Sequence, residues 1–180
     1  MYTSCSSALL PKSFTVTIEH VGRASFVLKT ELHLPVSLKR AFSFFEDPRN
    51  LFFITPDWLD FRMHGLPASL AVAEGSEFDY RIRWLRIKMP WKSRIVNYRP
   101  PEEFTDVQIQ GPYRTWLHIH RFDTTKQGTF MTDEVHYCIP FFLIGTLAHT
   151  LLIKKQLMDI FCYRAAKIYA WADQQKNSIP

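Results

Sequence analysis

Two histidines separated by one residue, His118 and His120, are the side chains of this sequence best suited to proton transfer or polar recognition. They lie in the segment Arg114 to Phe122, which alternates as a β-strand does. Successive side chains of a strand point to opposite faces, so both imidazoles lie on the same face.

Three further polar residues lie in the segments before and after this one. Asp106 and Gln108 belong to Phe104 to Gln110, and Asp133 belongs to Gly128 to Tyr137. If the three segments are antiparallel neighbours, these side chains meet the histidines across the sheet. The opposite face is also apolar, so alternation alone does not decide which side is buried; its residues are Val107, Ile109, Leu117 and Ile119.

Such a row supports three interpretations. The histidines and carboxylates could satisfy one another for purely structural reasons, as buried polar groups normally do. They could form the polar end of a pocket that orients a carbonyl or hydroxyl of a ligand. They could also act as general acid and base, because a histidine beside a carboxylate can move a proton near neutral pH. The candidates for such chemistry are His118, His120, Asp133 and Asp106.

Other kinds of site have little support. The His118-x-His120 pair could share a metal ion only with a third ligand such as Asp133, and nothing else approaches the density of a zinc site. Nucleophile motifs and phosphate-binding glycine loops are absent. The sequence therefore predicts neither metal nor cofactor, and it favours binding over catalysis.

The elements that would position these residues follow a simple order. Ser25 to Leu34 alternates as a strand, Ser37 could cap a short helix ending at Phe45, and Asn50 to Ile54 forms another helical turn. A series of strands follows, with a hairpin predicted at Met89-Pro90: Leu59 to His64, Glu77 to Lys88, Trp91 to Tyr98, Phe104 to Gln110, Arg114 to Phe122 and Gly128 to Tyr137. A helical pattern from Phe142 to Gln174 ends the chain.

This order predicts an α+β helix-grip fold, in which a curved antiparallel sheet of about six to seven strands wraps around a long C-terminal helix. Two short helices follow the first strand. We expect one ligand-binding domain over residues 23–175. Residues 1–22 are expected to be a tail or an extra edge segment, and residues 176–180 a short tail.

Composition limits the classes of function. The chain has 180 residues, of which 47% are hydrophobic, and its aromatics (15 Phe, 7 Tyr, 5 Trp) suit a core or the walls of an apolar pocket. The net charge is +5, but the basic residues are scattered among apolar ones, so no nucleic-acid partner is expected. Cys5, Cys138 and Cys162 are widely spaced, which favours reduced thiols. No stretch has the length of a membrane span and no secretory signal is evident, so we expect a cytoplasmic protein.

Several motifs resemble one protein superfamily. They are Asn50-Leu51, Ile54-Thr55-Pro56 with Trp58-Leu59, then Gly111-Pro112-Tyr113 with Trp116, His118 and His120, then Thr132-Asp133, Val135 and Tyr137, and finally Phe161 with Tyr163-Arg164. This set is similar to the START, Bet v 1 and polyketide cyclase/dehydrase-like superfamily, in a bacterial branch of ligand-binding members. The resemblance spans roughly Ser25 to Trp171 and implies the helix-grip fold. It also implies that the face bearing Trp116, His118 and His120 is the interior. Its members include lipid carriers, quinone-binding proteins, hormone receptors and cyclases, so it implies no single activity.

The resulting hypothesis is that the chain binds a small hydrophobic or amphipathic ligand, such as a lipid, quinone, polyketide or aromatic metabolite. The binding site would be a cavity of about 300–1,000 Å³ between the sheet and the last helix. The residues expected to line it are Trp84, Trp91, Phe104, Gln108, Trp116, His118, His120, Met131, Asp133, Tyr137 and Phe161.

Two alternatives remain open. The same pocket could cyclise or dehydrate a polyketide-like substrate by acid–base chemistry, or side chains could fill it while the outer apolar face forms a homodimer. Either a monomer or a homodimer fits the sequence. The apolar loop from Leu51 to Leu59 is interpreted as a lid or plug, with transient membrane contact as an alternative.

Overall fold

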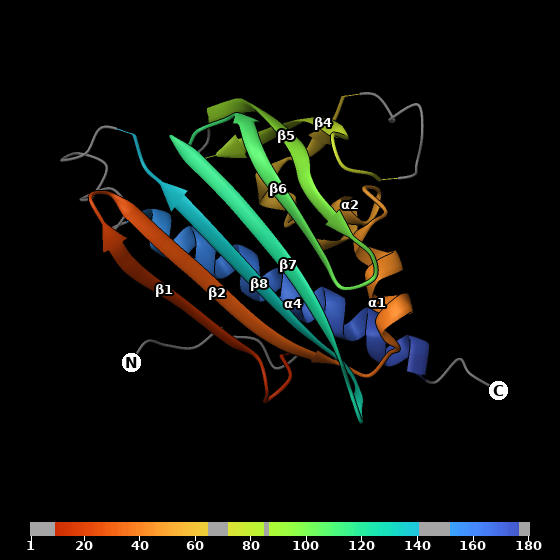
Figure 1. Cartoon of the computed structure of the whole chain (residues 1–180). Coiled ribbons are helices and arrows are strands. Elements are labelled where there is room, and N and C mark those ends of the chain that lie inside the picture. Colours follow the sequence, from red (N-terminus) through yellow and green to blue (C-terminus); the bar gives the residue numbers. More distant parts are fainter. Residues whose placement is uncertain (1–9, 65–71, 85–86, 141–151, 177–180) are drawn as a thin grey trace.

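The computed structural model describes residues 10–64, 72–84, 87–140 and 152–176. These residues form one antiparallel sheet in the order β1-β2-β8-β7-β6-β5-β4-β3. Its strands are β1 (Thr15–Gly22), β2 (Ser25–Leu34), β3 (Arg62–Met63), β4 (Glu77–Trp84), β5 (Ile87–Arg99), β6 (Glu103–Gln110), β7 (Thr115–Thr125) and β8 (Gly128–Cys138). The helix α4 (Lys154–Lys176) lies across one face of the curved sheet (Figure 1). The predicted α+β helix-grip fold is confirmed, and the sheet has eight strands rather than six or seven.

The burial pattern of the strands shows which face of the sheet α4 covers. In β2 the buried residues occur at every second position from Phe26 to Leu34, and in β7 from Trp116 to Phe122. The face bearing the two histidines is therefore the interior, as predicted. On the outer face Ile109 is exposed. At one edge β1 pairs with β2, so part of the predicted tail or edge segment is a strand.

Two short helices follow β2, as the sequence predicts. Helix α1 (Leu38–Phe45) begins after Ser37, whose hydroxyl accepts a hydrogen bond from the Arg40 backbone N–H at 3.4 Å. Helix α2 (Asn50–Ile54) comes next, and the side-chain amide of Asn50 donates to the Phe44 carbonyl at 2.7 Å. These helices lie at one end of the sheet, on the side of α4 (Figure 1).

Two predicted boundaries between Leu59 and Pro90 are wrong. The segment from Leu59 to His64 is not one strand. A 3-10 turn (Asp57–Leu59) comes first, and only the two residues of β3 form a strand. Between them, Asp60 has a left-handed backbone conformation (φ 43°). The predicted hairpin at Met89-Pro90 does not exist, because β5 already begins at Ile87. Pro90 is accommodated inside β5 because it lies beyond the residues that pair with β6, where no ladder hydrogen bond requires its N–H.

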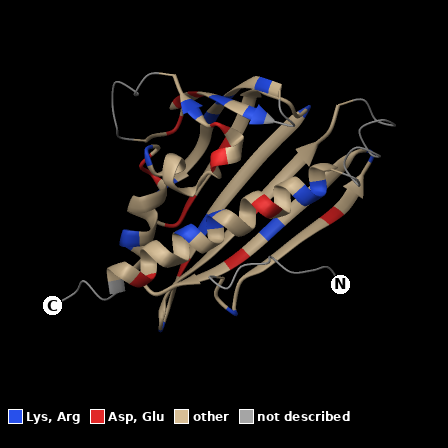
Figure 2. Cartoon of the chain, turned by 180° about the vertical axis from the view of Figure 1, so that it is seen from behind, with Lys and Arg blue, Asp and Glu red and all other residues tan. Residues whose placement is uncertain are grey.

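Helix α4 supplies the wall opposite the sheet. Its buried residues recur every three or four positions, at Leu157, Phe161, Ala165, Ile168 and Ala172. The predicted helical segment from 142 to 151 lies outside the described residues. No described helix is long and apolar enough to cross a membrane. Basic and acidic residues are interspersed along α4 and the strands (Figure 2).

One prediction about the cysteines is wrong. Cys162 of α4 is disulfide-bonded, whereas Cys138 at the end of β8 is a free thiol. An odd number of cysteines does not exclude one disulfide, and the sequence offers no motif that would have indicated it.

Buried apolar residues form two clusters. One includes Leu34, Phe42 and Phe122 and packs against α1 and the C-terminal half of α4. The other includes Phe26, Leu28, Tyr137 and Leu157 and lies toward the beginning of α4. The polar residues singled out in the sequence lie where these two clusters meet.

Candidate functional site

A pocket of about 180 Å³ lies between the sheet, α4 and the segment that carries α1 and α2. Most of its wall is apolar, including Trp91, Phe104, Trp116 and Phe161. It is smaller than the predicted cavity of about 300–1,000 Å³, because aromatic side chains from both clusters project into the space. Trp91 and Trp116, for example, meet edge to face with their ring centroids 5.2 Å apart.

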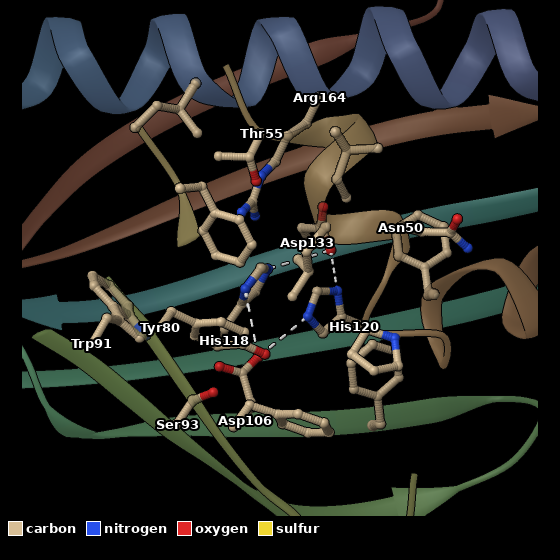
Figure 3. Close-up of a pocket in the computed structure, with 18 of the residues that line it drawn as sticks. Asn50, Thr55, Tyr80, Trp91, Ser93, Asp106, His118, His120, Asp133 and Arg164 are labelled. Atoms are coloured by element: carbon tan, nitrogen blue, oxygen red, sulfur yellow. Dashed lines mark hydrogen bonds and ion pairs between the residues drawn. The ribbon is translucent and has the colours of Figure 1, made fainter. Parts of the chain in front are cut away.

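The sheet register brings four polar residues of this pocket together. Asp106 of β6 lies directly opposite His118 of β7, and Asp133 of β8 lies directly opposite His120. Both histidines are on the same face of β7, so each also reaches the other aspartate diagonally. We call His118, His120, Asp106 and Asp133 the polar square (Figure 3).

Each histidine of the polar square contacts both carboxylates through opposite ring nitrogens. His120 Nδ1 lies 2.7 Å from Asp133 Oδ1, and His120 Nε2 lies 3.4 Å from Asp106 Oδ2. His118 Nε2 lies 3.4 Å from the same Asp133 oxygen, and His118 Nδ1 lies 3.7 Å from Asp106 Oδ2. Only the His120 Nε2–Asp106 contact also has the direction of a hydrogen bond. The square therefore retains hydrogen-bonding capacity that its own members do not use.

Burial and neighbouring charges move the pKa values of the two histidines in opposite directions. Burial, with a contribution from neighbouring His120, lowers the pKa of His118 below its usual value. For His120 the burial effect is outweighed by Asp133 and Asp106, which raise its pKa to about 9. Burial also disfavours the Asp133 carboxylate, yet the two histidines hold its pKa well below the usual range. At neutral pH the square therefore contains a neutral His118 beside a protonated His120 paired with ionised Asp133.

A charged residue reaches the pocket from α4 and was given no role by sequence reasoning. Arg164 points from the helix toward the polar square, beside Thr55 (Figure 3). Its guanidinium carbon lies 5.4 Å from the centroid of the Phe161 ring. Burial lowers the pKa of its guanidinium, although Asp133 and Asp106 oppose this effect. The sequence held a signal for it, since Arg164 lies three residues after Phe161 and four before Ile168, on the apolar stripe of α4.

Three members of the square could in principle hold a metal ion. One ligand atom each from Asp106, His118 and His120 lies within 4.8 Å of the others. Two features oppose a cation there. His120 would first have to lose a proton that two carboxylates stabilise, and the Arg164 guanidinium adds a further positive charge to the pocket.

Only some of the residues that the sequence predicted around a ligand line the pocket. Seven of them line the pocket: Trp91, Phe104, Trp116, His118, His120, Asp133 and Phe161. Met131 and Tyr137 do not line it, because they are buried in the two core clusters on either side. Gln108 instead supports the Gly111-Pro112 turn by donating to the Tyr113 carbonyl at 2.7 Å. The Trp84 side chain lies outside the described part of the chain.

The segment from Leu51 to Leu59 closes one side of the pocket. Leu51, Ile54 and Leu59 line the pocket, whereas Phe52, Phe53 and Trp58 are about half exposed. Both faces of this short segment are thus apolar, which fits a lid or plug.

Comparison with known proteins finds similar folds among solved structures only. No protein-family model and no curated protein matches the sequence. Among solved structures, the di-domain ARO/CYC StfQ of the steffimycin biosynthetic pathway matches with a TM-score of 0.66 at 15% identity, over 86% of this chain and 53% of that one. The chain has the START/Bet v 1-like fold.

Two other solved structures match this chain over nearly their whole length. Protein Ms6760 of Mycobacterium smegmatis gives a TM-score of 0.61 at 14% identity, over 89% of this chain and 99% of that one. SA2116 of Staphylococcus aureus, described as a protein of unknown function, gives a TM-score of 0.64 at 11% identity, over 86% of this chain and 97% of that one. At these identities the START/Bet v 1-like likeness concerns the fold alone, so function must be argued from the pocket.

Proposed function

We propose that this protein binds a small, largely apolar molecule in the pocket between the sheet and α4. The observation that carries the proposal is the juxtaposition of the polar square and Arg164 with a mostly apolar wall of aromatic and aliphatic side chains. Ligand sites commonly combine apolar walls with a few convergent polar groups that fix orientation. The same fold in the ARO/CYC StfQ is consistent with such a role.

The size of the pocket narrows the ligand class. A volume of about 180 Å³ suits a compact aromatic, quinone-like or polyketide-like molecule, or the head of a longer lipid whose tail extends past the lid. Phe52, Phe53 and Trp58 on the lid could then contact a membrane while the ligand enters.

The test is to identify what copurifies with the protein. Solvent extraction and mass spectrometry should find an organic compound with the wild type. It should be absent from Ser93→Leu, because Ser93 is a buried residue of the wall and a larger side chain would fill the space. Ser43→Leu is the matched control, since Ser43 is exposed on α1. A wild-type protein that carries no compound and does not bind the apolar dye Nile red would contradict the proposal.

One observation favours a second candidate function, acid–base catalysis on a polyketide-like substrate. The pKa values of His118 and His120 are moved in opposite directions, so one is suited to accept a proton and the other to donate one. Incubating the copurified compound with wild type and His118→Gln separates the candidates. In a binding protein the compound returns unchanged from both, and affinity changes by about tenfold at most. In an enzyme the wild type converts it, and turnover falls by about 10²–10⁴ in the variant.

A further inference from the structure

Arg164 brings an unsatisfied buried hydrogen-bond donor into the pocket. Its Nε atom is buried and has no hydrogen-bond partner among the described residues, and no carboxylate among them forms an ion pair with its guanidinium. Burying a charged donor without acceptors is unfavourable, so a structure that tolerates one normally supplies an acceptor from another source. Thr55, beside Arg164, also has a buried hydroxyl that finds no partner in the described part of the chain.

The orientation of Arg164 limits where that acceptor can lie. The side chain lines the pocket and points away from α4 toward the polar square (Figure 3). The Phe161 ring contacts both Arg164 and His118, with its centroid 5.4 Å from the guanidinium carbon and 5.8 Å from the His118 ring centroid. Because all three side chains line the same pocket, an acceptor that meets the guanidinium lies in the pocket on the side of the polar square.

The charges of the site indicate what kind of acceptor fits. The formal charges of Asp106 and Asp133 are balanced by protonated His120 and Arg164, so the polar square and Arg164 are neutral together. Two more carboxylates line the pocket: Glu46, which accepts a hydrogen bond from the Tyr98 hydroxyl, and Asp47, which pairs with Arg49. An anionic ligand would add an unbalanced charge beside two carboxylates at low local dielectric, whereas an uncharged oxygen would leave the balance intact.

We propose that Arg164 anchors the ligand by donating hydrogen bonds to an uncharged carbonyl oxygen, as in a ketone, quinone or ester, on an otherwise apolar molecule. This inference rests on the proposed function and adds the polar group by which the ligand is recognised. The apolar body of the ligand then lies against Trp91, Phe104 and Trp116, on the sheet side of the pocket.

Three naphthalenes of similar shape provide the test. Calorimetry would compare 2-acetylnaphthalene, which has a ketone, with 2-ethylnaphthalene, which has no acceptor, and with 2-naphthoate, which is anionic. The wild type should bind the ketone about ten- to a hundredfold more tightly than the hydrocarbon, the size of effect expected for a hydrogen bond to a charged donor. Arg164→Met should abolish this preference. Arg81→Met, which removes an exposed arginine of β4, should preserve it.

A second measurement needs no variant. The infrared carbonyl stretch of bound 2-acetylnaphthalene, labelled with ¹³C at the carbonyl, should lie at lower frequency than in an aprotic apolar solvent, because hydrogen bonding weakens the C=O bond. An unshifted stretch, or equal wild-type affinities for ketone and hydrocarbon, overturns the role of Arg164. Tighter binding of 2-naphthoate than of the ketone overturns the requirement for an uncharged group. If none of the three probes binds, the role of Arg164 as a carbonyl anchor is overturned, whereas the pocket function fails only if the wild type also carries no compound and does not bind Nile red.

Discussion

The polar square predicts an unusual loss of stability at mildly alkaline pH. In the folded protein the carboxylates raise the pKa of His120 to about 9, compared with about 6.5 for an unperturbed histidine. A raised pKa means that the stabilisation is fully present below pH 6.5 and is lost as pH rises through about 9. The shift corresponds to about 3 kcal/mol, and the side chain is only 10% exposed, so solvent screens the interaction little. We therefore expect the free energy of unfolding to fall by about this amount between pH 6.5 and 9.5.

Urea unfolding at closely spaced pH values would measure the effect. Unfolded-state cysteines also titrate in this range, so the informative quantity is the wild-type curve minus that of His120→Gln, in which the histidine contribution is gone. His136→Gln is the matched control, because His136 lies on β8 but is exposed. Parallel pH curves for wild type and His120→Gln would refute the reasoning. If His120→Gln does not fold, an NMR titration of His120 in the wild type tests the same point directly, and a pKa near 6.5 would refute it.

Three further predictions follow from particular contacts. Elemental analysis of protein purified without chelators should find no stoichiometric zinc or iron, and one equivalent that is lost on His118→Ala would contradict the charge argument against a metal. Gly128→Ala should destabilise the fold by more than about 2 kcal/mol in urea unfolding, because Gly128 has a φ of +134° and a Cβ there would overlap the Leu34 carbonyl; Gly22→Ala, with open space around it, is the control. Replacing Phe52 and Trp58 by Ser should weaken sedimentation with phospholipid vesicles if the lid contacts membranes, whereas unchanged sedimentation would exclude that role.

The sequence predicted the polar square better than it predicted the pocket around it. Period-two alternation fixed which side chains share a face, and short connections made β6, β7 and β8 neighbours, so His118 and His120 had to meet two carboxylates. Whether a large aromatic side chain lines a cavity or fills the core depends on where it lies relative to the pocket, and a shift by the width of one side chain changes the outcome. Local pattern does not contain that information, so Tyr137 and Met131 could not be separated from Trp116 and Phe104.

Arg164 illustrates a different limit. Its helical spacing placed it on the buried stripe of α4, but a basic residue in an amphipathic helix is usually assigned to the solvated side. Only the rotation of α4 about its own axis and its position over the sheet show that the guanidinium lies in the pocket. The errors at Leu59 to Pro90 have a third cause. Pro90 fits inside β5 because that part of the strand does not pair with β6, and the predicted strand from Leu59 fails at the left-handed Asp60. Neither feature leaves a clear signal in the sequence.

The polar square is hard to explain by stability alone. Replacing a buried ion-pair network with well-packed apolar residues is often neutral or stabilising, and the square lies between two apolar clusters that could have met directly. If it served only to set the sheet register, the single 2.7 Å contact between His120 and Asp133 would be enough, and Arg164 would have no reason to project from the helix into the same space. A ligand with a polar group accounts for both features, because it uses the remaining hydrogen-bonding capacity of the square and supplies the acceptor that Arg164 lacks.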